Sequence, residues 1–191
     1  MTALAIEPTT EIRPEPPHAG CVITACGSYA ARLAHGPGDA AAPSWYPERW
    51  TLDGPEPYAV PLPVNQPEEP GTSVLPLADG RVLIHRRTDG RHLFSLLYPT
   101  GPGTGELPLG AVECAELALL PPAPDGVGAY ALAPGDTATG VWRVAGGEFG
   151  PELVAQVAGR CSGGVWLDRA GRLLALDRAP AGGDGPVKTV V

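Results

Sequence analysis

Short apolar runs alternate with tight turns along most of this chain. Three turns carry a glycine at an equivalent place and return at nearly constant intervals: Asp79-Gly80, Asp125-Gly126 and Ala170-Gly171 lie 46 and 45 residues apart. Asp-Gly between alternating apolar residues is a strong hairpin signal, because both residues tolerate positive φ. A hairpin repeated at this interval predicts one four-stranded sheet per repeat, as in the blades of a propeller.

Placed on these turns, the apolar runs divide the chain into four units. The predicted strands are, unit by unit, 21–25, 29–33, 49–52 and 58–62; 73–77, 81–87, 92–98 and 106–109; 115–120, 128–132, 140–144 and 151–157; and 163–168, 172–178 and 186–191. Trp50, Phe94 and Trp142 fall at the same place in the third strands, where we expect them to pack between neighbouring blades. The best helical candidate, residues 28–34, is too short to be stable without tertiary contacts.

The fold class that follows is all-β, a β-propeller-like array of about four four-stranded blades with the last one incomplete. An antiparallel β-sandwich or barrel with evenly spaced hairpins is the alternative. The fourth unit stops at Val191 inside its third strand. Either the N-terminal residues Ala3–Ile6 pair with 186–191 and close the ring, or the array continues in a longer protein. The predicted organisation is an extended segment at 1–17, with the linker-like run Pro14–Pro17, and a propeller domain at 18–191.

Composition indicates which classes of partner to exclude and which cellular compartment to expect. The net charge of −8 and a pI near 4.9 argue against nucleic acid as a partner. No run approaches the roughly 20 apolar residues of a membrane helix, and the N-terminus lacks the basic and apolar regions of a signal peptide. We therefore expect a cytoplasmic protein without membrane contact. High Ala, Gly, Pro and Arg usage with one lysine, Lys188, is typical of a bacterial genome rich in G and C.

The cysteines and histidines predict neither a metal nor a cofactor. Cys21, Cys26, Cys114 and Cys161 form no C-x-x-C pair, and no two histidines have metal-ligand spacing. In a cytoplasmic chain we expect reduced, buried thiols, with a disulfide or a metal site as the alternative.

The densest polar patch lies at the turn between the second and third strands of the second unit. Its candidate binding residues are His85, Arg86, Arg87, Arg91 and His92. Strand alternation sends Arg86 to the face opposite His85 and Arg87. The arginine forks suit an anionic group or a partner carboxylate. The alternative is a solvated hairpin whose charges protect an exposed edge from aggregation.

No catalytic signature is present: the chain has no G-x-S-x-G elbow, P-loop, H-E-x-x-H or dinucleotide fingerprint. Ser162, in Cys-Ser-Gly-Gly, lacks the strand–elbow–helix context of a nucleophile and fits a turn. We predict no catalytic residues, and a protein that is not an enzyme.

The repeat resembles bacterial propellers of the broad kind found in WD-repeat proteins, in TolB-like proteins and in the N-terminal domain of prolyl-oligopeptidase-type hydrolases. The Gly-His and Trp-Asp dipeptides of WD repeats are absent, so the resemblance assigns no site residues. It implies a non-catalytic interaction module that presents loops on one face to a protein or small ligand. The alternatives are a substrate-gating propeller of a larger serine hydrolase and a free-standing structural protein. The sequence carries no signal of oligomeric state.

Overall fold

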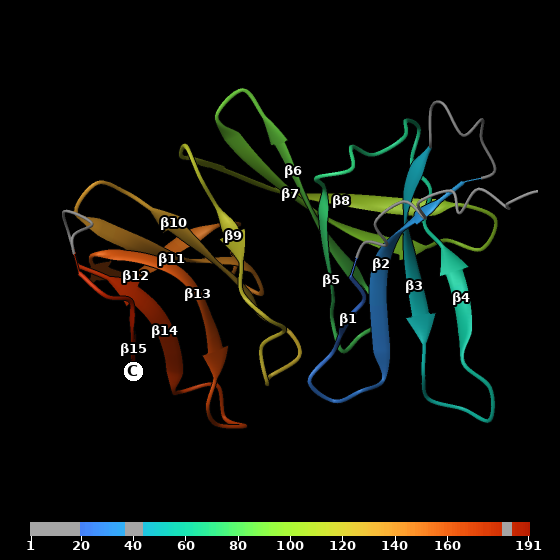
Figure 1. Ribbon diagram of the computed structural model, residues 1–191. Helices are drawn as coiled ribbons and strands as arrows, with labels where there is room; N and C mark the ends of the chain where they lie inside the picture. Colours follow the sequence, from blue (N-terminus) through green and yellow to red (C-terminus); the bar gives the residue numbers. More distant parts are fainter. Residues whose placement is uncertain (1–19, 37–43, 181–184) are drawn as a thin grey trace, which may run out of the picture.

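The computed structural model describes residues 20–36, 44–180 and 185–191, which form four small antiparallel sheets (Figure 1). The sheets contain β1 (Val22–Ile23), β2 (Tyr29–His35), β3 (Trp45–Thr51) and β4 (Tyr58–Pro61); β5 (Ser73–Pro76), β6 (Val82–Thr88), β7 (Arg91–Pro99) and β8 (Thr104–Glu113); β9 (Ala118–Leu119), β10 (Ala129–Pro134), β11 (Ala138–Ala145) and β12 (Glu152–Ala158); and β13 (Arg160–Trp166), β14 (Leu174–Ala179) and β15 (Lys188–Val190). Within every sheet the strands lie side by side in chain order. The prediction of one sheet per repeat is therefore confirmed, and we call the sheets blades 1 to 4.

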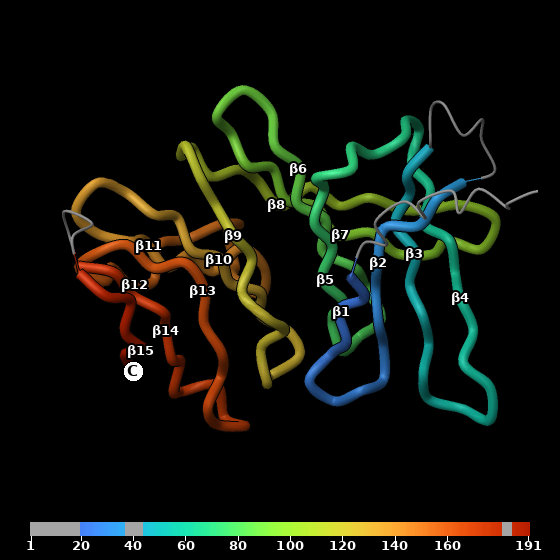
Figure 2. Tube along the Cα trace, in the orientation of Figure 1, coloured from blue at the N-terminus to red at the C-terminus, as the bar shows by residue number. Residues whose placement is uncertain are grey.

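The blades follow one another in chain order around a shared centre, as in a β-propeller. The first strand of each blade, β1, β5, β9 or β13, lies on the inner side of the array (Figure 2). Blade 4 has three strands in the described part of the chain, as the sequence indicated. The predicted closing strand at Ala3–Ile6 lies outside the described residues. None of the described residues is helical, so that part of the chain holds no helix able to span a bilayer.

The strands themselves differ from the predicted ones mainly in length. The helical candidate is β2, whose alanine-rich backbone is paired on both sides by β1 and β3; tertiary pairing here overrides local propensity. Strand β8 runs through Gly110, where the pattern predicted an end. The register shifts opposite, between Phe94 and Ser95, and Gly110 has a φ of 131°, so the glycine accommodates a bulge within a continuing strand.

The repeated turn joins the first two strands of each blade and has the same geometry throughout. Gly80, Gly126 and Gly171 have φ of 82°, 70° and 66°, and each N–H donates to the carbonyl three residues earlier. Gly27 of blade 1 has a φ of 79° and donates to the Thr24 carbonyl in the same way. The repeat analysis missed this fourth member because Gly27 and Gly80 lie 80 − 27 = 53 residues apart, outside the interval of 45 or 46.

Neighbouring turns also contact each other. The N–H of Ala78 donates to the Gly126 carbonyl at 2.8 Å, and Arg49 Nη1 donates to the Gly80 carbonyl at 3.0 Å. These bonds fix blade 3 against blade 2 and blade 2 against blade 1 at the turns.

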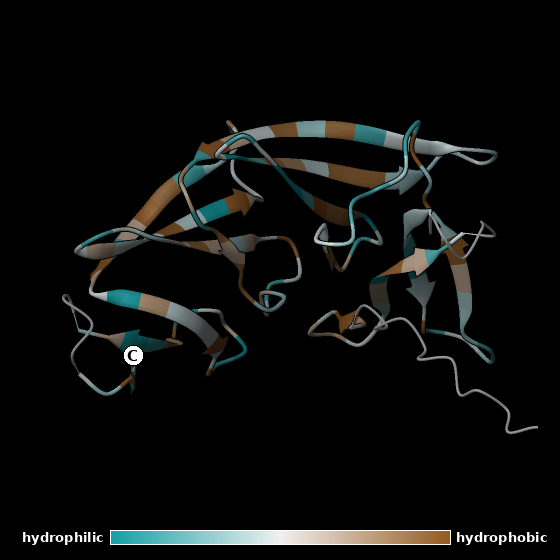
Figure 3. Ribbon diagram, turned by 45° about the horizontal axis from the view of Figure 1, so that its top comes forward, coloured by the Kyte–Doolittle hydropathy of each residue, from teal (hydrophilic) through white to brown (hydrophobic). Residues whose placement is uncertain are grey.

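Three separate apolar clusters hold the blades together, each between two neighbours, where apolar residues alternate with polar ones along the strands (Figure 3). Ile84 and Leu97 belong to the cluster between blades 1 and 2, and Phe94 to that between blades 2 and 3. Leu132 and Cys161 belong to the cluster between blades 3 and 4. Because side chains alternate between the two faces of a sheet, one strand contributes residues to the apolar clusters on both sides of its blade.

The predicted packing role of the three large third-strand residues is correct for two of them. Phe94 is 1% exposed, and Trp142 packs against the same cluster between blades 2 and 3. Trp50 lies opposite Ala30, on the face of blade 1 that turns away from blade 2. Its indole N–H donates to Glu48 at 2.7 Å and its ring lies beneath Arg32. The prediction for Trp50 was wrong because no described sheet covers this face.

The four cysteines are free thiols, and their burial differs from the expectation. Cys161 is buried and Cys114 is half-buried, but Cys21 and Cys26 are exposed. Both exposed thiols flank the two-residue strand β1, which is too short to cover its neighbours. In the described part of the chain, no group of three or more His, Cys, Asp or Glu side chains is placed to hold a metal ion.

Candidate functional site

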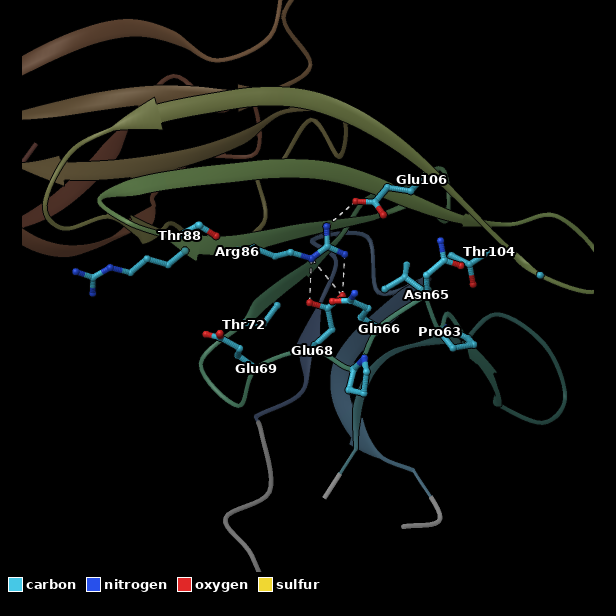
Figure 4. Close-up of a pocket in the computed structure, with 14 residues that line it drawn as sticks. Pro63, Asn65, Gln66, Glu68, Glu69, Thr72, Arg86, Thr88, Thr104 and Glu106 are labelled. Atoms are coloured by element: carbon cyan, nitrogen blue, oxygen red, sulfur yellow. Dashed lines mark hydrogen bonds and ion pairs between the residues drawn. The ribbon is translucent and has the colours of Figure 1, made fainter. Parts of the chain in front are cut away.

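A hollow with a volume of about 740 Å³ lies between blades 1 and 2. One wall is the connection from β4 to β5, and the other is the side of blade 2 that faces blade 1 (Figure 4). Most lining side chains carry an amide, hydroxyl or charged group: Asn65, Gln66, Glu68, Glu69, Thr72, Arg86, Arg87, Thr88, Thr104 and Glu106. We call this hollow the interblade groove.

Arg86 lies at the centre of the groove, between two carboxylates. Its Nε and Nη2 donate to Glu68 at 2.9 and 2.7 Å, and its Nη1 donates to Glu106 at 2.5 Å. Figure 4 shows the guanidinium between the two acids. The hydrogen bonds that Arg86 donates to Glu68 raise the pKa of Arg86 above its ordinary value, despite burial. The Glu68 side chain is 5% exposed, so this ion pair is largely shielded from solvent.

Glu106 supplies the second carboxylate from the outer strand β8. Burial acts to raise its pKa, but hydrogen bonds with Arg86 and Ser95 outweigh burial and lower it. The carboxylate is therefore ionised at neutral pH. Two acids then share one arginine, and the exposed Glu69 adds a further acid to the rim.

Glu68 attaches the connection between β4 and β5 to both neighbouring blades. Its backbone N–H donates to the Trp45 carbonyl of β3 at 2.9 Å, while its side chain holds Arg86 of β6. The connection is thereby fixed to both blades.

The five predicted binding residues divide between the two faces of blade 2. Arg86 and Arg87 line the groove, although Arg87 also donates to the Ala115 carbonyl at 3.2 Å. Arg91 forms an exposed pair with Glu113 at 3.5 Å. The opposite orientation of Arg86 and His85 is as predicted. The binding role of this patch stays a prediction.

The two histidines of the patch lie inside the molecule rather than on an outward edge. His85 Nε2 and His92 Nδ1 are 2.8 Å apart, and the His85 ring stacks on Phe94 with centroids 5.2 Å apart. Burial, together with His92, lowers the pKa of His85 to about 4. Burial, together with Arg87, lowers the pKa of His92. Both rings are neutral at pH 7, and their exposure was mispredicted because hairpin polarity alone does not show which residues the next blade covers.

The sequence analysis missed the groove residues contributed by the connection, Asn65, Gln66 and Glu68. This Pro-rich stretch has no hydrophobic periodicity. The pairing of Glu68 with Arg86, 18 residues apart, leaves no local pattern in the sequence. The sequence analysis placed Glu106 on an outer strand, but its pairing with Arg86 depends on the twist of blade 2.

Comparison with known proteins supports the fold alone. No protein-family model matches the chain, and a search of curated proteins finds no match. Among solved structures, the chain is similar to TolB from Acinetobacter baumannii, with a TM-score of 0.56 and 13% sequence identity. The match covers 91% of this chain and 40% of that chain. The chain is thus a β-propeller-type protein that spans less than half the length of the TolB structure it matches.

Proposed function

We propose that the chain is a non-catalytic binding module that takes an extended polypeptide segment into the interblade groove. The observation that carries this proposal is the groove itself, about 740 Å³ in volume and lined mostly by polar groups. Small-molecule sites of similar volume are mostly apolar. An extended polypeptide instead presents backbone donors and acceptors in alternation, and the amides of Asn65 and Gln66 can both donate and accept.

The arrangement of the acids supports binding rather than catalysis. General acid–base chemistry uses a carboxyl group whose pKa lies near the working pH. Glu68 and Glu106 are instead both engaged by Arg86, and the pKa of Glu106 is lowered. Among the remaining lining residues, the polar uncharged groups are amides and hydroxyls, and the charged ones are Glu69 and Arg87.

The test uses a library of random 12-residue peptides displayed on phage, selected on the purified full chain. The selected peptide is then titrated into wild type, Gln66→Ala and the matched control Gln156→Ala, which removes an exposed amide from β12 of blade 3. Loss of one hydrogen bond predicts about 2- to 10-fold weaker binding for Gln66→Ala. The control should bind as wild type does.

Two results would contradict the proposal. One is equal affinity of the Gln66→Ala variant and wild type for every selected peptide. The other is cleavage of the bound peptide, followed by mass spectrometry, because a binding module leaves its ligand intact. The gating propeller of a larger serine hydrolase stays the alternative prediction, and peptide cleavage after fusion to a hydrolase domain would favour it.

A further inference from the structure

The interblade groove carries more negative than positive charge. Its charged lining residues are three acids and two arginines: Glu68, Glu69, Glu106, Arg86 and Arg87. Arg87 also donates to the Ala115 carbonyl in the connection from β8 to β9, a group that does not line the groove. The centre of the groove is left with two carboxylates that share the guanidinium of Arg86, which gives this network one formal negative charge in excess.

Arg86 offers little to an anionic ligand, because all three of its guanidinium nitrogens already donate within the protein. Its Nε and Nη2 donate to Glu68, and its Nη1 donates to Glu106. A carboxylate or phosphate entering the groove would have to displace one of these acids and would be repelled by the other. The geometry therefore favours a cationic ligand group over an anionic one at the centre of the groove.

Glu106 is the carboxylate of this network that a ligand can reach. Its side chain is 32% exposed, compared with 5% for Glu68, and Figure 4 shows the two acids on different sides of the guanidinium. Arg86 donates to one of its two oxygens, Oε1. Since an ionised carboxylate accepts about four hydrogen bonds, Glu106 can accept from a further donor while it stays bonded to Arg86 and Ser95.

We propose that the segment bound in the interblade groove presents an arginine or lysine side chain to Glu106. The inference rests on the proposed function and names the chemistry of the segment that the groove selects. A cation beside Glu106 neutralises the excess negative charge of the partly buried network, and a charge removed from water is costly unless it is paired. The net charge of −8 on the whole chain attracts a basic segment over a longer range.

The experiment uses the 12-residue peptides selected on the full chain. Each basic residue of the tightest peptide is replaced in turn by a neutral residue of similar shape, citrulline for arginine or acetyl-lysine for lysine. Both forms are titrated into wild type, Glu106→Gln and the matched control Glu113→Gln. Glu113 lies on the same strand, β8, and pairs with Arg91 at 3.5 Å, but it does not line the groove.

We expect one basic residue of the peptide to depend on Glu106. Its neutral replacement should weaken binding to wild type by about 5- to 10-fold, the loss of a partly shielded, charge-assisted hydrogen bond. Glu106→Gln should weaken the basic peptide by a similar factor, while its amide oxygen still accepts from Arg86. The neutral peptide should lose little more in this variant, because both changes remove the same contact. Glu113→Gln should change the affinity of either peptide by less than about 2-fold.

The results that overturn this inference differ from those that overturn the proposed function. Peptides that bind through Gln66 but contain no basic residue, or lose nothing when it is neutralised on wild type, would refute the contact with Glu106 and leave the binding module standing. Equal weakening by Glu106→Gln and Glu113→Gln would also refute the contact, since it indicates general attraction by the net charge. A selection that yields no binding peptide would refute the proposed function and this inference together.

Discussion

The buried histidine pair is the residue-scale feature with the clearest physical consequence. One ring must donate and the other accept in the 2.8 Å contact between His85 and His92. The outer nitrogens, His85 Nδ1 and His92 Nε2, are buried without a partner among the described residues. Among the described residues, the charged group that acts on the pair is Arg87, whose positive charge opposes protonation of His92.

This environment predicts that the protein loses stability in mild acid. The pKa of His85 falls from its ordinary 6.5 to about 4 in the folded state, so between these values the unfolded chain binds the extra proton. The free energy of unfolding should be constant above about pH 6.5 and fall by up to about 3 kcal/mol as the pH drops to 4. Urea unfolding at pH 7.5, 6.5, 5.5 and 4.5 measures this slope.

A His85→Phe variant provides the control. The phenyl ring can stack on Phe94 but cannot take up a proton, so the slope between pH 6.5 and 4.5 should shrink. An unchanged slope in this variant would assign the acid sensitivity to other groups. Carboxylates with lowered pKa, such as Asp79 and Glu106, act at lower pH and would not mimic the effect.

At the scale of the elements, the repeated turn makes a specific demand at Gly126. Its φ is 70°, and a Cβ added there would lie 2.5 Å from the Cβ of Ala78 in the neighbouring turn. Gly126→Ala therefore combines left-handed strain, about 1–2 kcal/mol, with a steric clash of about 1–3 kcal/mol. Thermal or urea unfolding should show a loss of about 2–5 kcal/mol in unfolding free energy.

Gly90→Ala separates the two contributions. Gly90 has a φ of 77°, but an added Cβ would meet nothing within 4 Å, so only the backbone strain remains. The Gly90 variant should lose about 1–2 kcal/mol. Equal losses in both variants would show that the contact between turns contributes nothing to stability.

Much of the architecture could be predicted from these turns, because hairpin chemistry is local. Asp79-Gly80 and Asp125-Gly126 fix where two strands meet, and alternating apolar residues then set the sheet. Lengths were less predictable: β8 continues through Gly110 because the bulge opposite β7 depends on a register that only pairing defines. The fourth turn, at Gly27, was missed because the longer first unit places it 80 − 27 = 53 residues before Gly80, off the interval of the other turns.

The candidate site was far less predictable than the fold. The sequence marked Arg86 as a charged group but could not supply Glu68, which approaches from the connection between β4 and β5. The sequence also predicted a binding role at the surface for His85, but the neighbouring blade covers this residue. Which blade face is buried depends on the order of the sheets around the array, and no local pattern encodes that order.

At the scale of the whole molecule, stability is divided among three interfaces rather than gathered in one core. Blade 2 is packed on both faces, through Ile84 towards blade 1 and Leu83 towards blade 3. Blade 4 contacts blade 3 alone among the described blades, and Val165, Leu167 and Leu173 are half exposed. The likeness to TolB concerns this arrangement of sheets.

The unequal packing predicts that blade 4 opens before the rest of the molecule. In native-state hydrogen exchange, amides of β14 should exchange at a lower free energy of opening than amides of β6, because regions with fewer buried apolar contacts open locally. Mass spectrometry of peptic fragments resolves the two strands. Identical opening free energies for both would mean that the array unfolds as a single cooperative unit instead.

The two attachments of Glu68 join ligand binding to the position of a loop. Its backbone N–H donates to the Trp45 carbonyl of β3, and its carboxylate holds Arg86 in the interblade groove. A ligand that competed for Arg86 would release the side-chain attachment of the connection to blade 2 and leave its backbone attachment to blade 1. By thermodynamic reciprocity, whatever factor that attachment imposes on the affinity of the ligand, the ligand imposes on the attachment. Binding in the groove and the hold of the connection on blade 2 are therefore mutually dependent.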